Sequence, residues 1–212
     1  MDRKQKITLI KSWNLFSKLS DEEAGLIGDV TSEKIFKQNH VFIEEGLPGE
    51  EVYFIVSGLT RVYRMTEDGK EIAITMRTPG EVVGEMALID EGPRSASVQT
   101  IQETKVLVLR KQHFIDILHK HPSVAVNLIK ILVGRLRENM FVMEESIAKQ
   151  LSERILRILQ ILASYFPNRE ITLSHEELAA LLGASRPRVT EALHKLENGK
   201  KVTLSHKKIR IL

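Results

Sequence analysis

The chain has 212 residues, of which 42% are hydrophobic and 28% are charged, and its formal net charge is +3. This length allows one large domain or two small ones, and the hydrophobic fraction is high enough to fill a core. The sequence has no cysteine and no apolar run of about 18 residues, which excludes disulfides, thiolate metal sites, cysteine-ligated iron–sulfur clusters and a membrane-spanning helix. Residues 1–11 lack the apolar segment of a signal peptide, so we expect a cytoplasmic protein.

Charge is distributed unevenly along the chain. Residues 1–150 carry 20 Lys and Arg against 22 Asp and Glu, whereas residues 151–212 carry 11 against 6. A small basic segment attracts the phosphate backbone of nucleic acids. Many solvated surfaces are also basic, so this asymmetry indicates a nucleic-acid partner only in combination with a motif.

The first predicted elements are two short helices, one over residues 13–19 and a second that begins at Asp21 with Ser20 as its N-cap. From about residue 34 to residue 110 the pattern changes to short β-rich runs separated by glycine turns. Asp68-Gly69 predicts a hairpin between residues 61–65 and 71–76. Many short strands of this kind are typical of an antiparallel sandwich or barrel.

A loop in this β-rich region carries the first functional candidates. It runs from Gly84-Glu85-Met86-Ala87-Leu88 to Pro93-Arg94-Ser95-Ala96-Ser97-Val98, so a carboxylate and a guanidinium lie nine residues apart. The guanidinium can bind a phosphate bidentately, and Ser95 can add a hydroxyl donor. Backbone N–H groups from Met86 onward can point at the same anion if a helix starts there.

Glu85 has a different preference, because a carboxylate only accepts hydrogen bonds and suits a sugar hydroxyl beside the phosphate. Together the two groups predict a pocket for a sugar phosphate. The alternative is a plain ion pair between Glu85 and Arg94 in a tight loop.

A long helix is predicted next, from Pro122 at its first turn to about residue 147. Apolar and neutral residues recur along it at alternating spacings of three and four: Ile129, Leu132, Leu136, Asn139 and Met143. A sustained heptad seam predicts a partner helix, and hence a homodimer. The alternative is a helix packed against its own β-domain. The flanking charged positions are expected to be the more hydrated ones: Arg135, Arg137, Glu138, Glu144 and Glu145.

The basic C-terminal segment carries a second motif. Residues 173–183 read as a helix with a capping box between Ser174 and Glu177, ending at Gly183. A second helix follows, with Ser185 as a plausible N-cap and Pro187 tolerated in its first turn. Two short helices around a glycine turn predict a helix-turn-helix, and residues 200–212 predict a terminal β-hairpin, or wing. The alternative is an ordinary αα-hairpin.

The loop around Glu85 and Arg94 resembles the phosphate-binding cassette of cyclic-nucleotide-binding domains, and this resemblance covers about residues 10–120. With the helix-turn-helix behind it, the whole chain resembles the Crp–Fnr family of bacterial transcription regulators. The fold so implied is α+β: an N-terminal antiparallel β-roll or jelly-roll, a long dimerisation helix and a C-terminal winged helix-turn-helix. The expected domains are residues 1–121, 122–149 and 150–212.

The resemblance also implies the effector site. Glu85 is expected on the ribose 2′-hydroxyl, with Arg94 and Ser95 on the cyclic phosphate. The family's cyclic-AMP-responsive members carry a Thr-Ser pair that touches the adenine where this chain has Asn139-Met140. Asn139 therefore either reads a base edge or fixes the register of the dimer. The expected effector-binding residues are Gly84, Glu85, Met86, Ala87, Arg94, Ser95 and Asn139, with cyclic AMP as the expected effector and no cofactor.

For DNA, the resemblance implies that the helix starting near Ser185 enters the major groove and that Arg186 reads guanine. Pro187 stands where the family often has a Glu that reads the opposite strand, and Glu191 is a candidate substitute. The expected DNA-binding residues are Ser174, Ser185, Arg186, Arg188, Thr190, Glu191 and Lys195. RNA polymerase is the further expected partner.

The sequence leaves two alternative hypotheses of function. One is a constitutive DNA-binding protein with a different effector or none. The other is an enzyme, which has little support because the seven histidines show no metal-ligand spacing and no Gly-x-Ser-x-Gly or phosphate-loop lysine motif occurs. We therefore expect a regulator with no catalytic residue and no metal.

Overall fold

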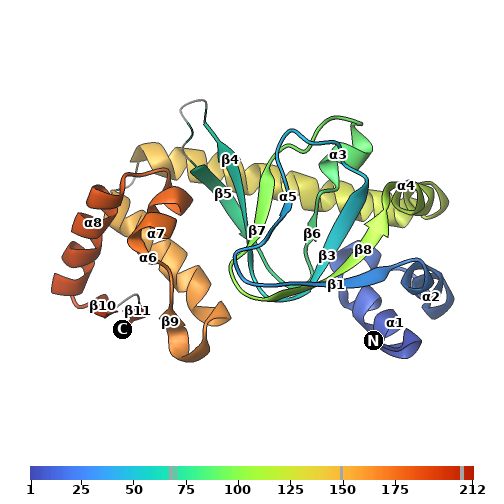
Figure 1. Cartoon of the computed structure of the whole chain (residues 1–212), viewed down its shortest axis with the longest axis horizontal. Helices are drawn as coiled ribbons and strands as arrows, with labels where there is room; N and C mark the ends of the chain where they lie inside the picture. Colours follow the sequence, from blue (N-terminus) through green and yellow to red (C-terminus); the bar gives the residue numbers. More distant parts are fainter. Residues whose placement is uncertain (67–68, 70, 149, 206–207) are drawn as a thin grey trace. The chain divides into compact units, whose positions relative to one another are not determined.

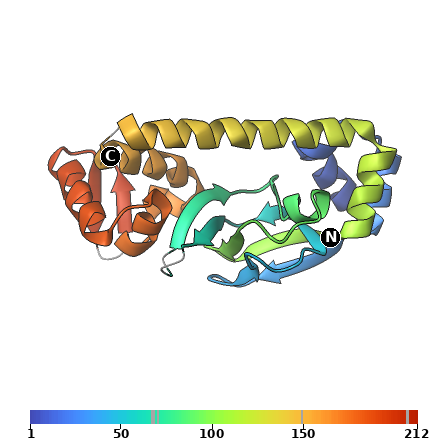
Figure 2. The ribbon, with the colours of Figure 1, turned by 90° about the horizontal axis from the view of Figure 1, so that it is seen from above.

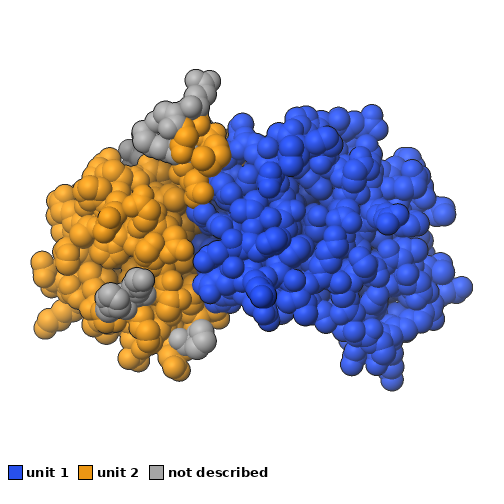
Figure 3. Space-filling view, in the orientation of Figure 1, with its two compact units in different colours: residues 1–64, 75–136 blue, residues 65–74, 137–212 orange. Residues whose placement is uncertain are grey.

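The computed structural model describes residues 1–66, 69, 71–148, 150–205 and 208–212, with the backbone alone described for 141–148 and 167. The chain divides into two compact units (Figure 3): residues 1–64 with 75–136, and residues 65–74 with 137–212. In the described part of the chain, no helix is both long and apolar enough to cross a membrane.

The N-terminal helices differ in part from the prediction. The first helix, α1 (Arg3–Ser12), precedes Trp13 and is capped by a reciprocal pair of hydrogen bonds between Asp2 and Gln5. Only a 3-10 turn, η1 (Asn14–Phe16), forms where the first helix was expected, because the extended backbone of Trp13 ends α1 there; Trp13, Leu15 and Phe16 are buried in the core. The second helix, α2 (Asp21–Asp29), begins as predicted, with the capping box of Ser20 and Glu23.

The strands form two four-stranded antiparallel sheets, in the orders β1-β8-β3-β6 and β2-β7-β4-β5 (Figure 1). This confirms the predicted antiparallel roll. Asp68 of the predicted hairpin turn lies outside the described residues. The bounds are β1 Ser32–Phe36, β2 Val41–Ile43, β3 Glu51–Ser57, β4 Thr60–Met65, β5 Glu71–Arg77, β6 Val82–Val83, β7 Ser97–Thr100 and β8 Thr104–Arg110.

The two faces of β3 pack against different cores. Val52 and Phe54 join the helical core, in which Trp13 stacks on Phe54 at 5.3 Å between ring centroids. Tyr53 and Ile55 point to the opposite face and pack inside the roll with Val83. The period-2 alternation of a strand produces this division, and it places β6 and the cassette that follows at the wall of the roll.

Two helices follow the roll, α4 (Lys111–Lys120) and the long α5 (Pro122–Ala148), which Figure 2 shows as one continuous helix. The buried side chain of Asn127 donates to the carbonyl oxygens of Asn14 and Leu15 and so fixes the start of α5 against η1. Leu132 of the predicted seam is partly buried and packs against the helical core of its own unit. The exposed apolar stripe of α5 keeps Ile129 and Leu136 of that seam and adds Val126, Val133 and Met140.

The other members of the predicted seam and its flanks differ in their exposure. Asn139 is exposed. Arg135 was expected in water, but its side chain is largely buried. The side chains of Met143, Glu144 and Glu145 lie outside the described residues.

The C-terminal segment contains the predicted winged helix-turn-helix. Gly183 ends the first of its two helices at φ +58°, in the left-handed region that favours glycine. The wing hairpin pairs with a short additional strand, giving the sheet order β10-β11-β9. The bounds are α6 Leu151–Leu162, η2 Ala163–Tyr165, η3 Pro167–Arg169, β9 Glu170–Ile171, α7 His175–Leu182, α8 Arg186–Asn198, β10 Val202–Ser205 and β11 Lys208–Ile211.

Candidate effector site and nucleic-acid interface

Two glycines shape the cassette around Arg94. Gly84 follows β6 at φ +83°, and a Cβ there would lie 2.6 Å from Nη1 of Arg94. A Cβ on Gly49 would lie 2.9 Å from Cζ of the same side chain. A short helix, α3 (Met86–Ile89), starts where the prediction needed one. Because neither glycine has a Cβ, the backbone at Gly49 and at Gly84 can lie in direct contact with the guanidinium of Arg94.

Arg94 is 7% exposed, and its hydrogen bonds go to backbone carbonyl oxygens: Nη1 donates to Gly84 at 2.6 Å and Nη2 to Glu51 at 2.6 Å. Burial lowers the pKa of this guanidinium from its ordinary value, although an Arg remains charged at neutral pH. The groups that accept its hydrogen bonds are neutral carbonyls, while the carboxylates of Glu51, Glu85 and Glu50 lie near enough to favour its charged form without such a bond. The site is therefore suited to an anionic ligand.

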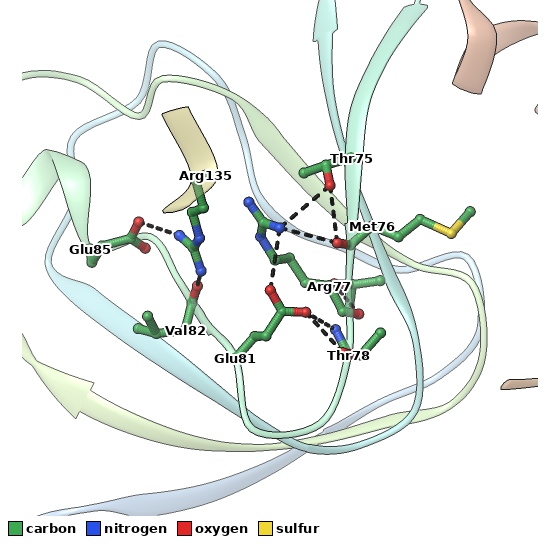
Figure 4. A network of polar contacts seen from close by, with 9 residues as sticks. Thr75, Met76, Arg77, Thr78, Glu81, Val82, Glu85 and Arg135 are labelled. Carbon is green, nitrogen blue, oxygen red and sulfur yellow. Dashed lines mark hydrogen bonds and ion pairs between the residues drawn. The ribbon is translucent and has the colours of Figure 1, made fainter. Parts of the chain in front are cut away.

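Glu85 is 2% exposed and pairs with an arginine other than Arg94 (Figure 4). Arg135 of α5 donates from Nη1 to Oε1 of Glu85 at 2.6 Å and from Nη2 to the carbonyl oxygen of Val82 at 2.6 Å. The predicted alternative, an ion pair between Glu85 and Arg94, is therefore wrong. Arg135 was missed as a site residue; its place on α5, one helical turn before Asn139, was the available signal.

The remaining cassette residues surround these two charges. Ala87 is buried, whereas Met86 is exposed, and Ser95 donates its hydroxyl hydrogen to the sulfur of Met86 at 3.7 Å. The fold thus brings the predicted cassette residues to one loop, from Gly84 to Ser95. Glu51, whose carbonyl oxygen helps to hold Arg94, was not expected there, because strand β3 lies far away in sequence.

The helix-turn-helix is held together by apolar residues on facing sides of α7 and α8. Leu178, Ala179 and Leu182 are buried on α7, and Val189, Ala192, Leu193 and Leu196 are buried on α8. The predicted candidates Arg186, Arg188, Glu191 and Lys195 are exposed on α8, as is Ser185 just before it. Glu191 and Lys195 pair at 3.0 Å.

Ser174 and Ser185 illustrate two different capping outcomes. Ser174 forms the predicted capping box with Glu177. Ser185 directly precedes α8, but its side chain makes no capping hydrogen bond. Pro187 explains part of this missing bond, because a proline nitrogen carries no hydrogen and so removes one of the N–H groups that an N-cap side chain could bind.

His175 connects the two helices of the motif, since its Nδ1 lies 2.8 Å from the hydroxyl of Thr190. Burial, followed by the positive neighbours His194 and Arg186, lowers the pKa of His175 below its ordinary 6.5. Folding therefore favours the neutral imidazole, and the stability linked to this group is complete above pH 6.5 and falls as the pH drops below that value.

We expect the amide protons of α7 and α8 to become less protected between pH 7 and pH 5.5, after correction for intrinsic exchange, in the full-length protein. His175→Gln should remove most of this pH dependence, and His194→Gln should weaken it by removing one repelling neighbour. An unchanged pH dependence in His175→Gln would assign the effect to another group.

Comparisons with known proteins agree with this architecture. Residues 33–121 match the family model of the cyclic nucleotide-binding domain, and residues 153–212 match that of the Crp-like helix-turn-helix domain. The cyclic AMP receptor protein of Thermus thermophilus is 32% identical over 187 residues, covering 88% of this chain and 87% of that protein. The global nitrogen regulator of Synechocystis is 24% identical over 185 residues, covering 83% of this chain and 82% of that protein.

A solved structure of the c-di-GMP-responsive global regulator CLP of Xanthomonas campestris has the same fold. Its TM-score is 0.79 at 19% identity, covering 91% of this chain and 99% of that one. A roll with a cyclic-nucleotide cassette, followed by a long helix and a winged helix-turn-helix, defines a DNA-binding transcription regulator with an effector domain. The chain belongs to the Crp–Fnr family of transcription regulators.

Proposed function

We propose that this protein is a homodimeric, sequence-specific regulator of transcription whose DNA binding is gated by a cyclic nucleotide, with cyclic AMP as the first candidate. The observation that carries the proposal is Arg94, a buried cation held by two carbonyl oxygens at the loop that carries the cassette motif. In this proposal residues 1–121 bind the effector, 122–149 form the dimerisation helix and 150–212 bind DNA.

In the proposed complex Arg94 and Ser95 hold the cyclic phosphate, and Glu85 accepts a hydrogen bond from the ribose 2′-hydroxyl. Gly84, Met86 and Ala87 supply the surrounding backbone. Glu85 is already paired with Arg135. A bound ribose must therefore either use the remaining acceptor positions of the Glu85 carboxylate or break this ion pair. Arg135 is on α5, so the same event changes how the long helix is held against the roll. For Asn139 both alternatives stay open: it contacts the base of the nucleotide, or it fixes the register of the two helices in the dimer.

The direct test is calorimetric titration of cyclic AMP into the full-length protein, followed by DNA binding with and without the ligand. We expect saturable binding and a rise in DNA affinity of roughly 5- to 150-fold, the range of a coupling free energy of about 1–3 kcal/mol. DNA binding at full affinity without any effector would instead support the constitutive alternative. Binding of neither cyclic AMP nor cyclic GMP would direct the search to another anionic effector.

The exposed stripe of α5 supports the proposed dimer. Val126, Ile129, Val133, Leu136 and Met140 recur at spacings of three and four and are all exposed in the single chain. A stripe with this spacing along several turns is the pattern from which two-helix coiled coils form, and it supports a seam here. Pairing of two copies would remove this apolar surface from water and set the two recognition helices for half-sites about 34 Å apart.

We predict that Leu136→Glu converts the protein to a monomer, because it places a carboxylate in the middle of the stripe. Sedimentation equilibrium measures the mass, and DNA titration should show a large loss of affinity for a two-half-site operator. Lys130→Glu introduces the same carboxylate on an exposed flank of α5 and serves as the control. A dimer that persists in Leu136→Glu would place the interface elsewhere.

The proposed DNA contacts come from α8 and from the residues at the starts of α7 and α8. Arg186 reads guanine, with Arg188, Thr190 and Glu191 as further base or phosphate contacts, and Lys195 on phosphate. Ser174 and Ser185 lie at the starts of α7 and α8, where backbone phosphates would approach. We further propose RNA polymerase as a partner, a cytoplasmic location alongside the DNA, and no catalytic activity.

A further inference from the structure

The hydroxyl group of Ser95 donates its hydrogen to a methionine sulfur. The acceptor is Sδ of Met86, which lies 3.7 Å from Oγ of Ser95. In the proposed function the same hydroxyl donates to the cyclic phosphate. Because a serine hydroxyl has only one hydrogen to donate, the sulfur of Met86 and the phosphate compete for it.

The thioether of Met86 is a weak competitor that solvent can reach. A thioether sulfur accepts hydrogen bonds weakly, whereas a charged phosphate oxygen accepts them strongly, so the phosphate is expected to take the hydroxyl of Ser95. Met86 is the first residue of α3 and is 47% exposed, while the two residues after it, Ala87 and Leu88, are buried. An oxidant in solution can therefore reach this sulfur while the buried part of the cassette stays packed.

Oxidation of the sulfur reverses this competition. Hydrogen peroxide transfers one oxygen atom to a thioether: the O–O bond breaks, an S–O bond forms, the sulfur loses two electrons, and the second oxygen leaves as water with both hydrogens. The product is a polar sulfoxide, whose oxygen accepts hydrogen bonds much more strongly than the sulfur did. The chain has no cysteine, so reversible oxidation at sulfur can occur only on its methionines.

We propose that Met86 is an oxidation site that controls the effector pocket, because its sulfoxide keeps the hydroxyl of Ser95 from the cyclic phosphate. This inference rests on the proposed binding of a cyclic nucleotide at Arg94. The sulfoxide oxygen also carries partial negative charge, which opposes an anion at the same loop. Methionine sulfoxide reductases convert the sulfoxide back to the thioether, so the change is reversible.

The test measures the affinity of the full-length protein for cyclic AMP and cyclic GMP by calorimetry, before and after treatment with hydrogen peroxide. Peptide mass spectrometry gives the fraction of sulfoxide at each methionine. We expect conversion of Met86 and a loss of affinity of about tenfold or more, as for the loss of one hydrogen bond to a charged acceptor. Treatment with methionine sulfoxide reductase should restore the affinity.

Three variants assign the effect to this pair of residues. In Met86→Leu, peroxide should leave the affinity at its value before treatment, whatever that value is. In Ser95→Ala the hydroxyl is absent, so oxidation should change the affinity by less than about threefold. Met65→Leu is the matched control, because Met65 is also 47% exposed but ends strand β4 outside the cassette. This variant should show the full loss of affinity on oxidation.

The outcomes separate this inference from the function beneath it. If a cyclic nucleotide binds and the sulfoxide of Met86 forms without loss of affinity, the inference is overturned and the proposed function stands. Equal losses in Ser95→Ala and the unmodified protein overturn it too, because the hydroxyl is then not involved. Peroxide that converts Met65 but not Met86 has the same consequence. If the untreated protein binds no cyclic nucleotide, the proposed effector class fails and this inference fails with it.

Discussion

Arg94→Leu is expected to abolish the effector response and leave the fold in place. The guanidinium would donate two charge-assisted hydrogen bonds to the cyclic phosphate, each contributing about 1.5–3 kcal/mol. The expected loss of cyclic-nucleotide affinity is therefore on the order of 10²–10⁴-fold. Calorimetry measures the affinity, and DNA titration in the absence of effector should give the same value as the unmodified protein.

The substitution also removes two donors from buried carbonyl oxygens, those of Gly84 and Glu51, so its folding must be checked. Thermal unfolding monitored by circular dichroism provides this check. Arg94→Lys is the second variant, because it keeps the charge but loses the bidentate geometry, and it should retain part of the affinity. A full effector response in Arg94→Leu would place the anion elsewhere and overturn the proposed site.

Arg186→Ala is expected to relax the sequence preference of DNA binding. Arg186 is the first residue of α8 and is exposed, which is the position from which a recognition helix reaches base edges. Loss of a bidentate contact with guanine should cost about 1–3 kcal/mol on specific DNA and much less on random DNA. The measurement is a pair of titrations, specific and random duplex, at the same salt concentration.

Arg169→Ala is the matched control for charge, since it removes one exposed Arg from the same unit but outside α8. It should weaken specific and random binding alike, if it weakens either. Should Arg186→Ala also leave the ratio of specific to random affinity unchanged, Arg186 contacts phosphate or solvent and the base is read by another residue.

Local sequence signals determined much of this protein. The capping boxes that start α2 and α7 each depend on a Ser and a Glu three residues apart, and both formed as predicted. The helix end at Gly183 and the run of short strands also follow from neighbouring residues. The cassette motif and the helix-turn-helix each lie within one short segment of the chain. Their residues could therefore be recognised from the sequence, and they indicated the family.

The partners of the buried charges were decided by tertiary structure alone. Glu85 pairs with Arg135, which is 50 residues away, and Arg94 is held by the carbonyl oxygen of Glu51, 43 residues away. Leu132, a member of the predicted seam, is partly buried against the core of its own unit. Periodicity identifies which residues share a face of a helix, but which face is buried depends on the neighbouring elements that pack there. The sequence by itself therefore determined the elements and the two motifs, while packing between distant segments decided which charges meet and which apolar surface remains exposed.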